Sequence, residues 1–101
     1  MKKIAIAIFS IALLRLVASE GDSYKPKEGY VPNARTAMRI AEAVWIPIYG
    51  EKEIESEHPF TATLKNGVWT VEGTLHFSTG GVALAEIAQD DGRILRVIHG
   101  K

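Results

Sequence analysis

The histidines are the first side chains in this chain whose chemistry could support a metal site. His58, His76 and His99 lie on three separate predicted elements, and no second histidine follows any of them at the short spacings that zinc sites use. Isolated histidines of this kind are mostly ordinary surface or core residues. We therefore predict no metal-binding residues in this chain.

A row of glutamates is the second candidate for chemistry. Four of them occupy every second position between residues 51 and 57, which places them along one side of a predicted strand. They are Glu51, Glu53, Glu55 and Glu57. In an acid–base pair of carboxylates, apolar surroundings raise the pKa of one member. Nothing in the alternating pattern brings two of these glutamates against an apolar surface. We interpret the row as a solvated strand edge whose charges oppose aggregation between sheets.

The remaining candidates for catalysis or cofactor binding are turn and loop residues. Asp90 and Asp91 lie in a predicted turn, where neither can become the buried base that a small enzyme of the ketosteroid-isomerase type requires. The Gly80-Gly81 pair is not followed by a predicted helix, so it does not form a phosphate-binding loop. We predict that the protein is not an enzyme and has no catalytic or cofactor-binding residues.

Residues 1–19 have the form of a signal peptide. Lys2-Lys3 precedes an apolar run from Ile4 to Leu14, and small residues follow at Ala18-Ser19. The run is short for a membrane span, although Arg15 leaves open an uncleaved N-terminal anchor, the one form in which we expect membrane contact. The chain has no cysteine, so it forms no disulfide and carries no lipoprotein acyl chain. We predict a periplasmic or secreted protein.

Removal of the predicted signal peptide changes the charge balance. The whole chain carries 12 basic and 12 acidic residues, and the first 19 residues contain three basic residues and no acidic one. The remaining 82 residues therefore have a net charge of −3. Their basic residues are scattered, which argues against a nucleic-acid partner. A chain of this length forms one small domain.

The rest of the chain predicts a polar linker over residues 20–29 and one domain over residues 30–101. The domain begins with a helix between Asn33, a good N-cap, and Gly50, a good left-handed stop. Its predicted buried residues are Ala37, Ile40, Ala41, Val44 and Ile48. Pro47 interrupts the pattern, and we expect a kink or a loosened last turn there.

After the helix the apolar period changes from 3.6 to 2, which predicts strands. They cover residues 53–64, with a break at His58-Pro59, and residues 68–75, 82–88 and 94–99. Hairpin turns are predicted at Asn66-Gly67 and Asp91-Gly92. The predicted fold class is α+β, with one N-terminal helix packed on a four-stranded antiparallel meander sheet, as in a minimal cystatin-like or nuclear-transport-factor-like fold.

One face of the predicted sheet is the candidate for binding a partner. If Trp69, Val71, Ala83, Ala85 and Ile87 face the helix, the opposite face mixes aliphatic and charged side chains. The predicted partner-binding residues are Glu72, Glu86, Arg96, Val82, Leu84, Ile94 and Ile98. An apolar patch on the surface of a single domain usually binds something that covers it. A partner protein, the linker or a second copy in a homodimer could cover this one.

Several short motifs within residues 30–101 have the character of a family signature. They are Thr36-Ala37, Ile40 to Ala43, Pro47 to Glu51, Pro59-Phe60, Val68 to Gly73, and Gly80-Gly81 with His99-Gly100-Lys101. Together they resemble the nuclear-transport-factor-fold (NTF2-like) immunity proteins of bacterial polymorphic toxin systems. The resemblance implies an exported immunity protein that binds and neutralises a cognate protein toxin, and it supplies no catalytic residues.

A second class of protein fits the same predicted architecture. A helix followed by a meander sheet is similar to PepSY and cystatin-like modules, which would make the protein an inhibitor or chaperone of an extracytoplasmic peptidase. The neighbouring gene distinguishes the two, since a toxin gene favours immunity and a peptidase gene favours inhibition.

Overall fold

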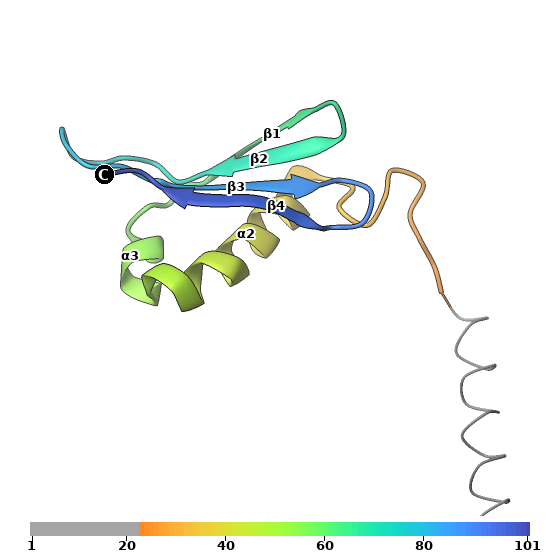
Figure 1. Cartoon of the computed structure of the whole chain (residues 1–101), viewed down its shortest axis with the longest axis horizontal. Coiled ribbons are helices and arrows are strands. Elements are labelled where there is room, and N and C mark those ends of the chain that lie inside the picture. Colours follow the sequence, from red (N-terminus) through yellow and green to blue (C-terminus); the bar gives the residue numbers. More distant parts are fainter. Residues whose placement is uncertain (1–22) are drawn as a thin grey trace, which may run out of the picture.

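The computed structural model describes residues 23–101, so the predicted signal peptide and the start of the predicted linker lie outside the described residues. The elements are α2 (Ala34–Tyr49), α3 (Glu51–Glu55), β1 (Thr61–Lys65), β2 (Val68–Glu72), β3 (Ala83–Ala88) and β4 (Ile94–His99). The strands form one antiparallel sheet in the order β1-β2-β3-β4, and the helices lie on one face of it (Figure 1). The predicted fold class is confirmed.

Local sequence determines both ends of α2. The side-chain oxygen of Asn33 accepts a hydrogen bond from the backbone N–H of Thr36 at 2.8 Å, so Asn33 is the N-cap. The helix runs through Pro47 to Tyr49 and stops at Gly50, whose φ of +98° favours glycine.

The buried stripe of α2 differs from the predicted one at its C-terminal end. Ala37, Ala41 and Trp45 are fully buried against the sheet, whereas Ile48 is 58% exposed. Tyr49, four residues after Trp45 on the same helix face, packs against the core in the last turn, so Ile48 lies outside the buried stripe. The prediction that Ile48 is buried is therefore wrong, and the larger Trp45 fills the space between helix and sheet.

The predicted strand over residues 53–64 is wrong in its first half. Glu51–Glu55 form the short helix α3, and β1 begins only at Thr61. Glutamate and lysine favour helix, and the helical backbone turns Ile54 into the core, where it is fully buried. Alternating charges over so few residues do not distinguish a period of 2 from one of 3.6.

The core lies between the helices and the inner face of the sheet. Trp69 and Val71 of β2 and Ala85 and Ile87 of β3 are buried there, as the alternation of these strands predicts. The indole N–H of Trp69 also donates a hydrogen bond to the backbone carbonyl of Val31 at 2.8 Å. This bond fastens the segment before α2 to the sheet.

The opposite face of the sheet, which we call the outer face, carries Thr70, Glu72, Leu84, Glu86, Arg96 and Ile98. No element of the described chain covers it (Figure 1). Within the described chain, no helix has both the length and the apolar character needed to cross a membrane.

Candidate functional site

Five of the predicted partner-binding residues share the outer face. Glu72, Leu84 and Ile98 are cross-strand neighbours that form one row across β2, β3 and β4. Glu86 and Arg96 lie opposite each other in the next row. Ile98 is 40% exposed, so the rows combine charged side chains with aliphatic surface that is open to solvent.

The other two predicted residues lie outside these rows. A β-bulge shifts the register between β3 and β4, so Ile94 pairs with Ile87, whose side chain is buried on the inner face. The pairing therefore takes Ile94 out of the rows of outer-face residues, although its side chain is 39% exposed. Val82 comes just before β3, outside the paired residues, and is partly buried.

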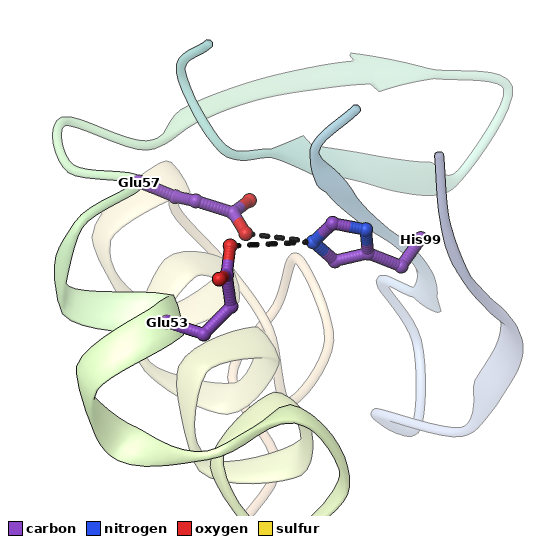
Figure 2. Close-up of side chains that lie close together, drawn as sticks. All are labelled: Glu53, Glu57 and His99. Carbon is purple, nitrogen blue, oxygen red and sulfur yellow. Dashed lines mark hydrogen bonds and ion pairs between the residues drawn. The ribbon is translucent and has the colours of Figure 1, made fainter. Parts of the chain in front are cut away.

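A second group of polar side chains, the Glu53/Glu57/His99 cluster, lies between α3 and β4 (Figure 2). Glu53 belongs to α3, Glu57 follows its last turn, and His99 ends β4. The Nε2 atom of His99 lies 2.8 Å from Glu57 Oε2 and 3.7 Å from Glu53 Oε2. The exposed fraction of the side chain rises from 5% for Glu57 to 22% for His99 and 49% for Glu53, so the cluster extends from the interior to the solvent.

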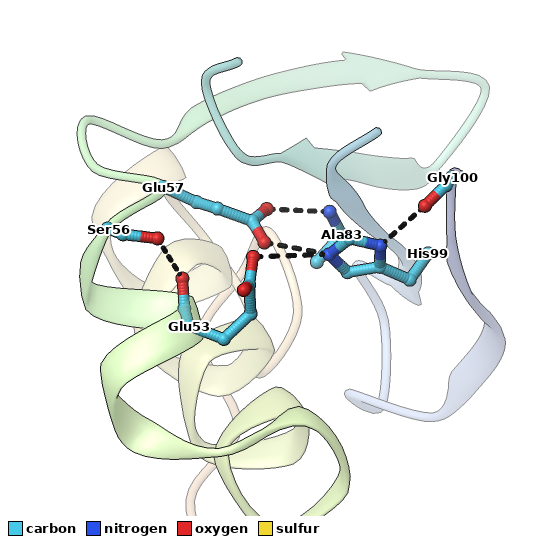
Figure 3. Close-up of polar contacts among 6 residues, drawn as sticks. All are labelled: Glu53, Ser56, Glu57, Ala83, His99 and Gly100. Carbon is cyan, nitrogen blue, oxygen red and sulfur yellow. Dashed lines mark hydrogen bonds and ion pairs between the residues drawn. The ribbon is translucent and has the colours of Figure 1, made fainter. Parts of the chain in front are cut away.

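Backbone groups hold two of these side chains in place (Figure 3). Glu57 Oε1 accepts a hydrogen bond from the Ala83 N–H at 2.7 Å, and His99 Nδ1 lies 2.7 Å from the carbonyl oxygen of Gly100. Gly73 packs so closely on the Glu57 side chain that a Cβ atom at this position would overlap it. These contacts explain how a carboxylate is accommodated in the protein interior.

The hydrogen bonds of the cluster favour a positively charged His99 beside a negatively charged Glu57. Both ring nitrogens of His99 face acceptor oxygens, so both donate. Burial lowers the pKa of His99, but hydrogen bonds to the Gly100 carbonyl and the Glu57 carboxylate outweigh this effect and raise it. Burial raises the pKa of Glu57, but hydrogen bonds from the Ala83 N–H and His99 outweigh it and lower that pKa. The pKa of Glu53 is raised, chiefly by its side-chain hydrogen bond with Glu57.

Sequence reasoning missed this cluster. The prediction that all four glutamates are solvated is wrong for Glu57, which is 4% exposed. Glu57 and His99 are 42 residues apart, and the predicted strand concealed that Glu53 and Glu57 have the i, i+4 spacing of neighbours on a helix. The cluster also bears on the prediction of no metal-binding residues, because its three potential ligand atoms lie within 4.8 Å of one another.

Of the other two histidines, His58 lines a groove of about 280 Å³ between α2 and the segment before β1. The groove is lined by Arg35, Met38, Arg39, Glu42, His58, Pro59 and Phe60. His58 stacks on Phe60 with ring centroids 4.1 Å apart, and its Nε2 lies 3.2 Å from a carboxylate oxygen of Glu42. His76 Nε2 lies 2.6 Å from the carbonyl oxygen of His58. Ordinary contacts therefore account for both residues.

Comparison with known proteins assigns the family. A family model described as NTF2 fold immunity protein matches residues 36–101. The uncharacterized protein YhhH of Escherichia coli strain K12 is 38% identical over 94 residues, which cover 91% of this chain and 72% of YhhH. The uncharacterized protein YbbC of the same strain is 33% identical over 82 residues, covering 79% of this chain and 66% of YbbC. No solved structure matches the chain significantly.

The chain belongs to the NTF2-fold immunity protein family, as the resemblance of its motifs predicted. Membership supports an immunity role and implies a toxin as the binding partner. The role that this family implies is one of binding a partner.

Proposed function

We propose that this protein is an exported immunity protein that binds and neutralises a cognate polymorphic toxin through the outer face of its sheet. The family supports the immunity role. The choice of surface rests on one observation: within residues 23–101, no element covers a sheet face that presents exposed aliphatic and charged side chains together.

The composition of the outer face suits a protein partner. Leu84 and Ile98 are neighbours across β3 and β4 and would supply apolar area that is buried on binding. Glu72, Glu86 and Arg96 would accelerate the encounter with a toxin of complementary charge and select against other partners. The antiparallel pairing of three strands holds these side chains in fixed positions, which lowers the entropic cost of binding.

Export is the second part of the proposal, and its support comes from the sequence. Lys2-Lys3 and the apolar run from Ile4 to Leu14 have signal-peptide form. An immunity protein outside the cytoplasm would meet its toxin in the periplasm or at the cell surface.

A protection assay tests the binding surface. The double variant Glu72→Lys/Glu86→Lys, co-expressed with the toxin encoded by the neighbouring gene, should lose protection while its circular dichroism spectrum stays that of the wild type. The matched control is Glu51→Lys/Glu55→Lys, which makes the same charge change on exposed positions of α3. This control should protect normally, because α3 lies on the opposite side of the sheet (Figure 1).

The other outcomes separate the surface from the role. If the outer-face variant protects and the α3 variant does not, the toxin binds on the helical side of the sheet. If wild-type protein gives neither protection nor a calorimetric signal with the purified toxin, the peptidase-inhibitor alternative replaces the immunity role. If light scattering shows that the wild type is a dimer and the outer-face variant is a monomer, a second copy of the chain binds this face.

A further inference from the structure

We propose that the Glu53/Glu57/His99 cluster binds a divalent transition-metal ion, with one imidazole nitrogen and two carboxylate oxygens as ligands. Zn²⁺ and neighbouring ions accept this set of donors, and a water molecule would complete a four-coordinate site. The ligands come from α3, from the segment that follows it and from the end of β4, so the ion would join parts of the chain that are distant in sequence (Figure 2).

The spacing of the donor atoms fits such an ion. With bonds of about 2.0–2.2 Å in tetrahedral geometry, two ligand atoms are about 3.4 Å apart. The observed distances from His99 Nε2, 2.8 Å to Glu57 Oε2 and 3.7 Å to Glu53 Oε2, lie on either side of this value. Glu53 is the most exposed of the three, so its side chain can adjust to close the site.

Groups outside the cluster already orient two of the ligands. A metal-bound histidine usually donates its second ring N–H to a carbonyl or carboxylate, and His99 Nδ1 faces the carbonyl oxygen of Gly100 in this way (Figure 3). The Ala83 N–H holds Glu57 Oε1, which leaves Oε2 directed at His99 Nε2. A metal ion would take the place of the proton on Nε2.

The charge of the cluster also favours a cation. Two carboxylates face one imidazole, and among residues 23–101 no lysine or arginine forms an ion pair with Glu53 or Glu57. The ring of Tyr49, 5.0 Å from the imidazole ring between centroids, covers part of the site. Because the ligands are assembled only in the folded chain, binding would stabilise the fold.

Calorimetry on the full-length protein, stripped with EDTA and titrated with ZnCl₂, tests the site. We expect one Zn²⁺ per chain and a rise in the melting temperature, with much weaker binding of MgCl₂, which prefers all-oxygen octahedral sites. His99→Gln and Glu53→Gln should each weaken Zn²⁺ binding by about tenfold or more. The matched controls His58→Gln and Glu55→Gln change the same residue types outside the cluster and should bind Zn²⁺ like the wild type.

The Glu53 variant keeps the test decisive even if His99→Gln destabilises the fold, because the Glu53 side chain is half exposed. The proposal is overturned if wild-type protein shows no saturable Zn²⁺ binding. It is also overturned if Glu53→Gln and His99→Gln bind like the wild type, since the ion would then occupy a different site. The result is independent of whether the outer face binds a toxin.

Discussion

Replacing Trp69 by alanine tests how the sheet divides into an inner and an outer face. Trp69 is 7% exposed and packs in the core beneath α2, and its indole N–H donates to the Val31 carbonyl. Truncation of a buried tryptophan to alanine costs about 3–5 kcal/mol, because the apolar contacts are lost and a cavity remains. A domain of about 80 residues has a free energy of unfolding of about 4–12 kcal/mol, so Trp69→Ala should remove a large part of it.

Urea unfolding measures this loss, and a second variant separates its components. Trp69→Phe keeps an aromatic ring in the core but loses the hydrogen bond to Val31, so it should cost less than Trp69→Ala, about 1–2 kcal/mol. Trp45, which is fully buried, remains as a fluorescent probe in both variants. Phe77→Ala is the matched control, since that aromatic side chain is 75% exposed and its loss should change stability by less than about 0.5 kcal/mol. A cost below about 1 kcal/mol for Trp69→Ala would refute the assignment of the two faces.

Two further predictions concern pH and location. With EDTA present, the free energy of unfolding should decline as pH rises above 6.5. The pKa of His99 is higher in the folded protein than in the unfolded chain, so protonated His99 stabilises the fold. This stabilisation is complete below the pKa of the unfolded chain and is lost as pH rises through the pKa of the folded protein. Glu57 has the opposite effect, because its pKa is lower in the folded protein than in the unfolded chain. Ionised Glu57 stabilises the fold above pH 4.5, and this stabilisation is lost as pH falls through the pKa of the folded protein. Urea midpoints across this range measure both effects, and a His99→Gln variant that retains the alkaline decline would contradict the first. For location, mass spectrometry of fractionated cells should find a periplasmic protein that starts near Ser19 or Glu20, whereas a cytosolic form that retains Met1 would contradict export.

The elements that sequence reasoning predicted correctly are those specified by local chemistry. The cap at Asn33, the stop at Gly50 and the hairpin turn at Asn66-Gly67 depend on residues a few positions apart, and their preferences are the same in any fold. The alternation in β2 and β3 also predicted which side chains face α2, because a strand has a strict period of two.

The predictions that failed depended on less local information. In Glu51–Glu55 the same residues fit a charged strand or a helix, and the burial of Ile54 in the core decides for the helix. The bulge opposite Glu86 and Ile87 arises from strand pairing, and it places Ile94 opposite Ile87 without any signal in the residues of β4 alone.

The sequence by itself determined the family, the order of the long helix α2 and the four strands, and which side chains of β2 and β3 face the helix, because motifs, caps and periodicity act over short spans of chain. Only the tertiary structure decided that Glu57, His99 and Ala83 meet. A buried carboxylate requires partners from several elements at once, and the packing of α3 against the end of β4 supplies them. The chemistry of the cluster is therefore a property of the folded domain.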